Sequence, residues 1–227
     1  MRGWPRCRGM RSLLAATLML ALPAALAGCA GDPPPDTFYE LRAGETGWRF
    51  EPPLLDGAVV VERFEADGVL NERALLYKPE QGPELRQYGY HHWVGTPATL
   101  LREAVIDVYR EANVATRVAS PTRRLLPDYR VTGRLVRLYH ARGGARDHAR
   151  GGAGAGVIAV EIAVTRARDG ASILLERYER RVPVKTERTD TRANVPAAVG
   201  ALRAGLTAIL GDSLADLTEV VAEGPKS

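Results

Sequence analysis

Residues 157–182 read VIAVEIAVTRARDGASILLERYERRV and decide the fold class of this chain. In the first half, Val160 and Ile162 alternate with smaller or more polar residues, which is typical of a β-strand with one buried face. The pair Asp169-Gly170 then favours a two-residue turn, and residues 172–182 return as a second strand. This stretch therefore predicts an antiparallel β-hairpin.

The same period of two continues on the N-terminal side of the hairpin. Tyr129, Val131 and Leu135 alternate with polar residues and predict a further strand with one face in water. Between this strand and the hairpin, Gly143 to Gly156 is rich in glycine and predicts a flexible loop. The run at 151–156 has the composition of a phosphate-binding loop, but a strand rather than a helix follows it, so the loop interpretation is preferred.

Two helices complete the predicted fold. One is expected from Pro97 to about residue 112, with Thr96 at its start and Asn113 at its end, and the other from about 194 to 222. Short strands are expected at 38–41, 58–64, 74–77, 85–90 and 114–118, and the third and fourth of them form a hairpin. The predicted fold class is α/β: a single compact domain with a mixed β-sheet, flanking helices and a long C-terminal helix.

Three glycines interrupt the predicted C-terminal helix: Gly200, Gly205 and Gly211. Each weakens a helix by up to about 1 kcal/mol relative to alanine. A close approach of the helix to the sheet, or a bend in the helix, would explain glycine at these positions.

Residues 1–28 have the composition of a cleaved signal peptide. Four arginines and no acidic residue precede an apolar segment that ends near Leu26, and Ala27-Gly28 then lead to Cys29. The string Leu-Ala-Gly-Cys resembles the bacterial lipobox, which predicts acylation of Cys29; the alternative is an ordinary secretory signal. Residues 29–37 are then a lipidated, proline-rich tether, and 38–227 form the domain. Because Ala30 rather than Asp follows the cysteine, we expect the outer membrane rather than the inner membrane.

Removal of the signal changes the charge and the cysteine content. The chain has 31 basic and 27 acidic residues, and loss of the four arginines makes these numbers equal, so no nucleic-acid partner is expected. Cys7 leaves with the signal, which excludes a disulfide or a cysteine-based site in the mature domain. Acidic residues outnumber basic residues by 15 to 8 in 29–115, and basic residues outnumber acidic residues by 17 to 8 in 116–192. These segments either interleave in the sheet or form opposed faces that suit a homo-oligomeric ring, a charged partner or anionic lipid.

A set of short sequence features stands in a defined order along the domain: Phe38 to Leu41, Val59 to Phe64, Val69 to Arg73, Leu75 to Tyr77, Tyr88 to Trp93 before Pro97, Leu100-Leu101, Tyr129 to Leu135 and the long C-terminal helix. This order resembles the ABC-type transport auxiliary lipoprotein family, of the paraquat-inducible C-lipoprotein type. The resemblance implies an α/β domain in a periplasmic accessory lipoprotein that docks an MCE-type ABC lipid transport system to the outer membrane. Its partners would be MCE-type transport subunits, and the chain has no Gly-x-x-x-x-Gly-Lys-Ser/Thr motif of an ATPase.

No catalytic residue, metal site or cofactor is predicted, and we do not expect an enzyme. His91 and His92 are neighbours on a predicted strand, so their side chains point to opposite faces and do not readily share one ion. Ser213 lacks the Gly-x-Ser-x-Gly context of a nucleophile. Asp212 and Asp216 fit the polar face of a helix.

Two groups of residues are predicted to dock a partner: Tyr88, Tyr90 and Trp93 before the first helix, and Arg130, Arg134 and Arg137 on the following strand. Exposed aromatic side chains suit interfaces, but these three would equally serve to join the strand to the helix. Two other functions stay open. One is a stand-alone lipoprotein that binds lipid or a small ligand under the C-terminal helix, and the other is an assembly factor for an outer-membrane protein.

Overall fold

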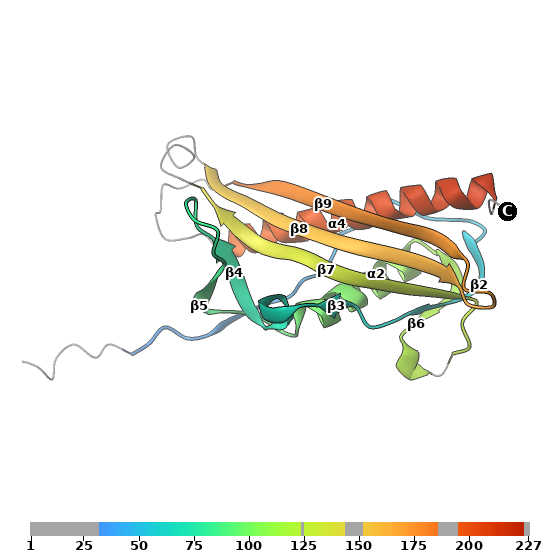
Figure 1. Ribbon diagram of the computed structural model, residues 1–227, viewed down its shortest axis with the longest axis horizontal. Helices are drawn as coiled ribbons and strands as arrows, with labels where there is room; N and C mark the ends of the chain where they lie inside the picture. Colours follow the sequence, from blue (N-terminus) through green and yellow to red (C-terminus); the bar gives the residue numbers. More distant parts are fainter. Residues whose placement is uncertain (1–31, 124, 144–151, 186–194, 225–227) are drawn as a thin grey trace, which may run out of the picture. The chain divides into compact units, whose positions relative to one another are not determined.

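The structure, a computed structural model, describes residues 32–123, 125–143, 152–185 and 195–224 (Figure 1). The chain divides into Met1–Pro35 and a compact unit, Asp36–Ser227, which holds every helix and strand of the described residues. The predicted signal peptide and Cys29 lie outside the described residues, as does most of the predicted glycine-rich loop.

The described residues of this unit form one mixed sheet and two α-helices, which confirms the predicted fold class. The helices are α2 (Pro97–Glu111) and α4 (Val195–Glu223), and two 3-10 turns are η1 (Gly68–Asn71) and η2 (Pro121–Arg123). The strands are β1 (Thr37–Tyr39), β2 (Leu55–Val61), β3 (Glu65–Ala66), β4 (Ala74–Lys78), β5 (Arg86–Trp93), β6 (Ala115–Ala119), β7 (Tyr129–Arg142), β8 (Gly152–Arg166) and β9 (Ser172–Lys185).

The long strand β7 organises the sheet. Along one edge it pairs in parallel with three short strands in succession, β2 at its start, β3 in its middle and β4 at its end. Along the other edge it pairs antiparallel with β8 over nearly its whole length. The sheet continues from β2 to β6 and from β4 through β5 to β1. The alternation seen from Tyr129 to Leu135 thus marks the first half of a longer strand.

The predicted hairpin is confirmed as β8 and β9, but β8 starts earlier than expected. The predicted two-residue turn is wrong, because Arg166 and Ala171 close a connection formed by residues 167–170. The prediction of a loop up to Gly156 is wrong for residues 152–156, which belong to β8. Gly154 has a φ of +99°, and a Cβ there would lie 2.0 Å from the carbonyl oxygen of Ala141. A Cβ at Gly156 would lie 2.8 Å from the backbone nitrogen of Leu202 on α4. These glycines therefore allow close packing between neighbouring segments.

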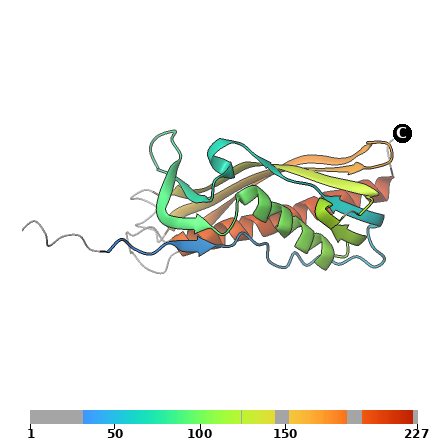
Figure 2. The same cartoon turned by 90° about the horizontal axis from the view of Figure 1, so that it is seen from below.

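Both helices pack against the same face of the sheet (Figures 1 and 2). Their buried side chains join one core, whereas the arginines of β7 are exposed on the other face. Helix α4 runs along β8 and β9, and α2 covers the region of β2, β3 and β6. Helix α4 is long and apolar enough to cross a membrane, yet 56% of its most apolar window is buried inside the domain. That degree of burial is typical of a core helix.

The end of α2 agrees with the prediction from the sequence. Asn113 has a φ of +53°, a left-handed conformation that asparagine tolerates better than most residues, and its side-chain amide donates to the carbonyl of Phe50 at 2.8 Å. At the other end, Thr96 occupies the N-cap position, but its hydroxyl contacts that of Thr99 at 2.9 Å rather than the helix backbone.

Candidate functional site

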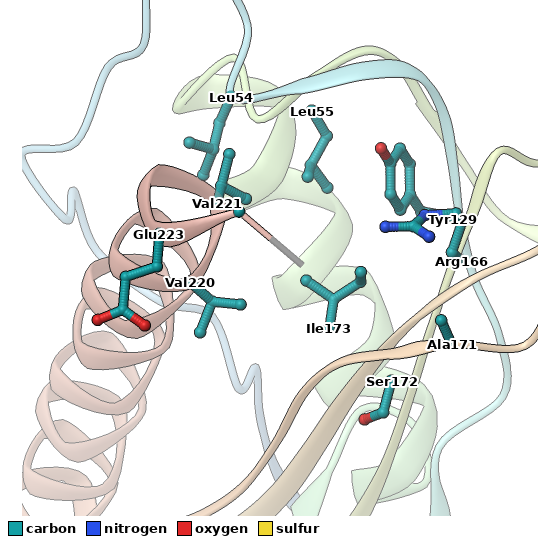
Figure 3. A pocket seen from close by; sticks show the side chains of 11 residues that line it. Leu54, Leu55, Tyr129, Arg166, Ala171, Ser172, Ile173, Val220, Val221 and Glu223 are labelled. Carbon is teal, nitrogen blue, oxygen red and sulfur yellow. The ribbon is translucent and has the colours of Figure 1, made fainter. Parts of the chain in front are cut away.

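A pocket of about 430 Å³ opens at the C-terminal end of α4, beside the β8–β9 turn (Figure 3). Its volume lies in the range of small-molecule sites. Apolar side chains supply much of its wall: Leu54, Leu55, Ile173, Val220 and Val221. A pocket under the C-terminal helix, which the ligand-binding alternative requires, is therefore present.

Polar groups line the pocket both on the side that faces away from α4 and on α4 itself, where Glu223 lies. Figure 3 shows Tyr129 and Arg166 on the side away from α4. The Arg166 guanidinium lies 3.1 Å from Asp169, whose pKa is lowered mainly by a hydrogen bond from the backbone of Ala171 and further by Arg166. Because the Arg166 charge already has a carboxylate partner, the pocket suits a mostly apolar ligand with a small polar end.

Strand β1 lies beside the N-terminal half of α4 (Figure 2), whereas the pocket lies at the C-terminal end of the helix. Just after β1, the amide of Gly44 donates to the Thr207 hydroxyl at 2.7 Å, which places this segment beside the first half of the helix. Leu54 and Val221 share the pocket wall at the other end. At a rise of 1.5 Å per residue, the helix separates these two regions by roughly 20 Å.

The three aromatic residues predicted to dock a partner have different surroundings. Trp93 is 1% exposed and packs in the core, as expected if it joins strand to helix, so its side chain is not accessible to a partner. Tyr88 is half-buried, and its hydroxyl lies 2.7 Å from Nδ1 of His140. Burial raises the pKa of Tyr88 to about 12. Tyr90 is 44% exposed and has a φ of +62°.

His140, 1% exposed, is a residue whose burial the sequence does not predict. The pairing of β7 with β8 shifts between Leu135 and Arg137, so an extra residue reverses the faces of the strand beyond it. The shift turns Leu138 and His140 into the core. A simple period of two, extended from Tyr129, places even-numbered positions in water.

Arg130, Arg134 and Arg137 are exposed on the outer face of β7, as a docking role requires. Each has an acidic partner in the domain, and these partners are Glu62, Asp67 and Glu179 respectively. Glu62 and Asp67 come from the acidic segment of the sequence, and the arginines come from the basic segment. These pairs favour interleaving of the two segments over two opposed charged faces.

The histidines of β5 follow the expected alternation. His91 Nδ1 lies 3.1 Å from the Tyr39 hydroxyl, whereas His92 Nε2 lies 3.4 Å from Asp36. Burial lowers the pKa of His91. Within the parts of the chain that the structure describes, no cluster of three or more His, Cys, Asp or Glu side chains could hold a metal ion.

Asp212 and Asp216 lie on a polar, partly exposed face of α4, as predicted, and the Asp212 side chain is 38% exposed. Asp216 accepts a hydrogen bond from the Tyr178 hydroxyl at 2.7 Å, and Asp212 pairs with Arg180, so both carboxylates link α4 to β9. Ser213 between them is fully buried and donates to the carbonyl of Leu210 at 2.9 Å.

No family model and no curated protein matches this sequence. Solved structures do match. Protein XCC0632 from Xanthomonas campestris, described with the family model DUF330, has a TM-score of 0.64 at 14% identity, over 82% of this chain and 98% of that chain. An uncharacterized protein has a TM-score of 0.54 at 14% identity, over 79% and 97%. A putative lipoprotein from Caulobacter crescentus has a TM-score of 0.37 at 14% identity, over 56% and 84%.

The first match shows that this chain shares the fold of the DUF330 protein over nearly all of that protein's length, and the second match shows the same for the uncharacterized protein. At 14% identity the likeness concerns the fold alone. The function must therefore be argued from the residues of this chain.

Proposed function

We propose that this protein is an envelope lipoprotein, anchored by acyl chains on Cys29, whose domain faces the periplasm. The observation that carries this proposal is the sequence Leu26-Ala27-Gly28-Cys29 after an arginine-rich, then apolar, segment. Each buried CH₂ of an acyl chain contributes about 0.8 kcal/mol, so two or more chains hold a protein stably on a bilayer. Ala30 after the cysteine supports sorting to the outer membrane.

Metabolic labelling with a palmitate analogue tests the anchor. Wild-type protein is expected to carry the label and to sediment with outer membranes in a density gradient, whereas Cys29→Ser loses both. Cys7→Ser is the matched control, because Cys7 lies in the signal, and it should keep the label. Label on C29S, or an unlabelled wild type, would overturn the proposal, and label in the inner membrane would correct the sorting.

We further propose a non-enzymatic role for the anchored domain as an accessory subunit of an MCE-type ABC lipid transport system. The order of sequence features that resembles the transport auxiliary lipoproteins supports this role. The domain would dock the inner-membrane machine to the outer membrane, and Tyr88, Tyr90 and the three outer-face arginines of β7 are the proposed docking residues.

Affinity purification from solubilised native envelopes, followed by mass spectrometry, tests the partner. The proposal expects an MCE-domain protein together with its permease and ATPase. Recovery of the lipoprotein alone, in a detergent that preserves other envelope complexes, would overturn it. A co-purifying β-barrel would instead support a role in outer-membrane protein assembly.

The pocket at the end of α4 supports a second candidate, a lipoprotein that binds an apolar ligand. Extraction of the purified protein would then release a stoichiometric lipid. Ile173→Trp fills the pocket from β9 and should abolish its retention, whereas Leu175→Trp, at a residue 70% exposed on the same strand, should not. Protein that carries no lipid but captures an MCE subunit would favour the accessory role.

A further inference from the structure

Exposed apolar side chains gather where the tether enters the domain. Among the described residues, six large apolar side chains are exposed, and two of them lie on β1 and directly after β5. They are Phe38, 51% exposed, and Val94, 46%. A single exposed apolar residue needs no explanation, but a pair at the point of membrane attachment does.

The register of β1 and β5 fixes the exposure of Phe38 and Val94. Phe38 pairs with His92, and the backbone of Val94 donates to the carbonyl of Tyr39 at 2.9 Å, so the ladder continues past the end of β5. Side chains alternate across a strand, so Phe38, His92 and Val94 share one face. Trp93, on the opposite face, is in the core.

A positive charge is held over this pair. The guanidinium carbon of Arg73 lies 5.4 Å from the centre of the Phe38 ring, and its Nε donates to the carbonyl of Trp93 at 3.1 Å. Its contacts are thus a ring face and a carbonyl oxygen. We call Phe38, Arg73 and Val94 the β1–β5 patch. Aromatic side chains are enriched at membrane–water interfaces, and basic side chains are attracted to anionic lipid headgroups.

The tether is short enough to bring the patch to the bilayer. Thr37, the first residue of β1, lies eight positions after Cys29, and three consecutive prolines between them favour an extended conformation. At about 3.1 Å per residue, an extended tether of eight residues spans roughly 25 Å.

We infer that the β1–β5 patch rests on the headgroup region of the bilayer that anchors the protein. This inference depends on the proposed acylation of Cys29. The acyl chains hold the domain at the membrane, and the patch sets which end faces it. The pocket then opens at the end of α4 away from the bilayer, where soluble partners or carried ligands reach it.

Fluorescence quenching in liposomes tests the inference. In the mature chain the acylated Cys29 is the only cysteine, so Phe38→Cys or Val94→Cys gives one site for an environment-sensitive dye. Leu175→Cys, at an exposed position on β9, is the matched control. Each full-length lipidated variant is placed in phosphatidylethanolamine–phosphatidylglycerol vesicles, with or without brominated lipid.

Brominated lipid is expected to quench the dye at positions 38 and 94 at least twofold more than at position 175. Equal quenching at all three sites overturns the inference. Dye emission at position 38 that depends on protein density but not on brominated lipid also overturns it, because a second copy of the protein would then cover the patch. Flotation of each sample is measured first. Protein that does not float contradicts the acyl anchor itself, so the two failures are distinct.

Discussion

A Cβ atom at Gly205 of α4 would lie 2.7 Å from Cγ2 of Ile158 on β8. The helix backbone therefore sits directly on a side chain of the sheet. Gly156 has the corresponding role on the sheet side, where it faces the backbone of Leu202. Two glycines, one on each element, set the distance between the C-terminal helix and the hairpin.

Gly205→Ala is expected to destabilise the domain. The added methyl group must displace Ile158 or the helix, and such overpacking costs about 1–3 kcal/mol, more than the helix gains from alanine. Gly200→Ala is the control on the same helix, because a Cβ there would meet no neighbouring segment within 4 Å, and it should stabilise by up to about 1 kcal/mol. Urea unfolding measures both, and equal effects would refute the close contact.

Tyr178→Phe is expected to weaken the attachment of α4 to β9. The change leaves the Asp216 carboxylate without the phenol that donates to it, and loss of a hydrogen bond to a charged group costs about 1.5–3 kcal/mol. The free energy of unfolding from urea titration checks this, with the exposed Tyr90→Phe as control. A double variant with Asp216→Asn should show a coupling energy between the two positions, and simple additivity would contradict a direct bond.

Tyr88 is expected to make the domain sensitive to alkaline pH. Burial raises its folded-state pKa to about 12 from the ordinary value of 10, so the unfolded chain loses this proton first as the pH rises. The contribution of Tyr88 to the free energy of unfolding is therefore fully present below pH 10 and falls between about pH 10 and 12. Thermal unfolding across this range should show a shallower decline for Tyr88→Phe than for wild type. Parallel curves for the two proteins would count against the burial of this hydroxyl.

Replacement of Arg130, Arg134 and Arg137 together is expected to weaken docking without lowering the stability of the domain. Their side chains are 44–52% exposed, and exposed ion pairs contribute little, so the alanine triple variant should keep a near wild-type Tm. Capture of an MCE-type partner should fall. The control is Arg168→Ala, which removes an arginine that is 77% exposed and lies outside β7. This change should not alter capture of the partner. A triple variant that captures normally would remove these arginines from the interface.

The mass of the purified protein in solution is expected to be independent of salt. The acidic and basic segments already pair within one domain, through Arg130 with Glu62 and Arg134 with Asp67, which leaves less charge to drive assembly of a ring. Light scattering at low and high ionic strength measures this. A ring that falls apart in high salt would revive the interpretation as opposed charged faces.

The sequence by itself determined the elements whose signals are local. The hairpin around Asp169-Gly170, the end of α2 at Asn113 and the long helix α4 all follow from it, because a turn residue or a hydrophobic period acts over a few neighbouring positions. The candidate anchor at Cys29 is likewise read from adjacent residues, and it remains a prediction.

Only the tertiary structure decided what depends on segments far apart in the chain. The bulge after Leu135 turns His140 inward, and the packing of α4 gives Gly156 its place in a strand instead of a loop. The pocket exists because Leu54, Ile173 and Val221 meet at one end of α4. No window of sequence contains these residues together, so side-chain packing between distant segments, and not local preference, determines the candidate site.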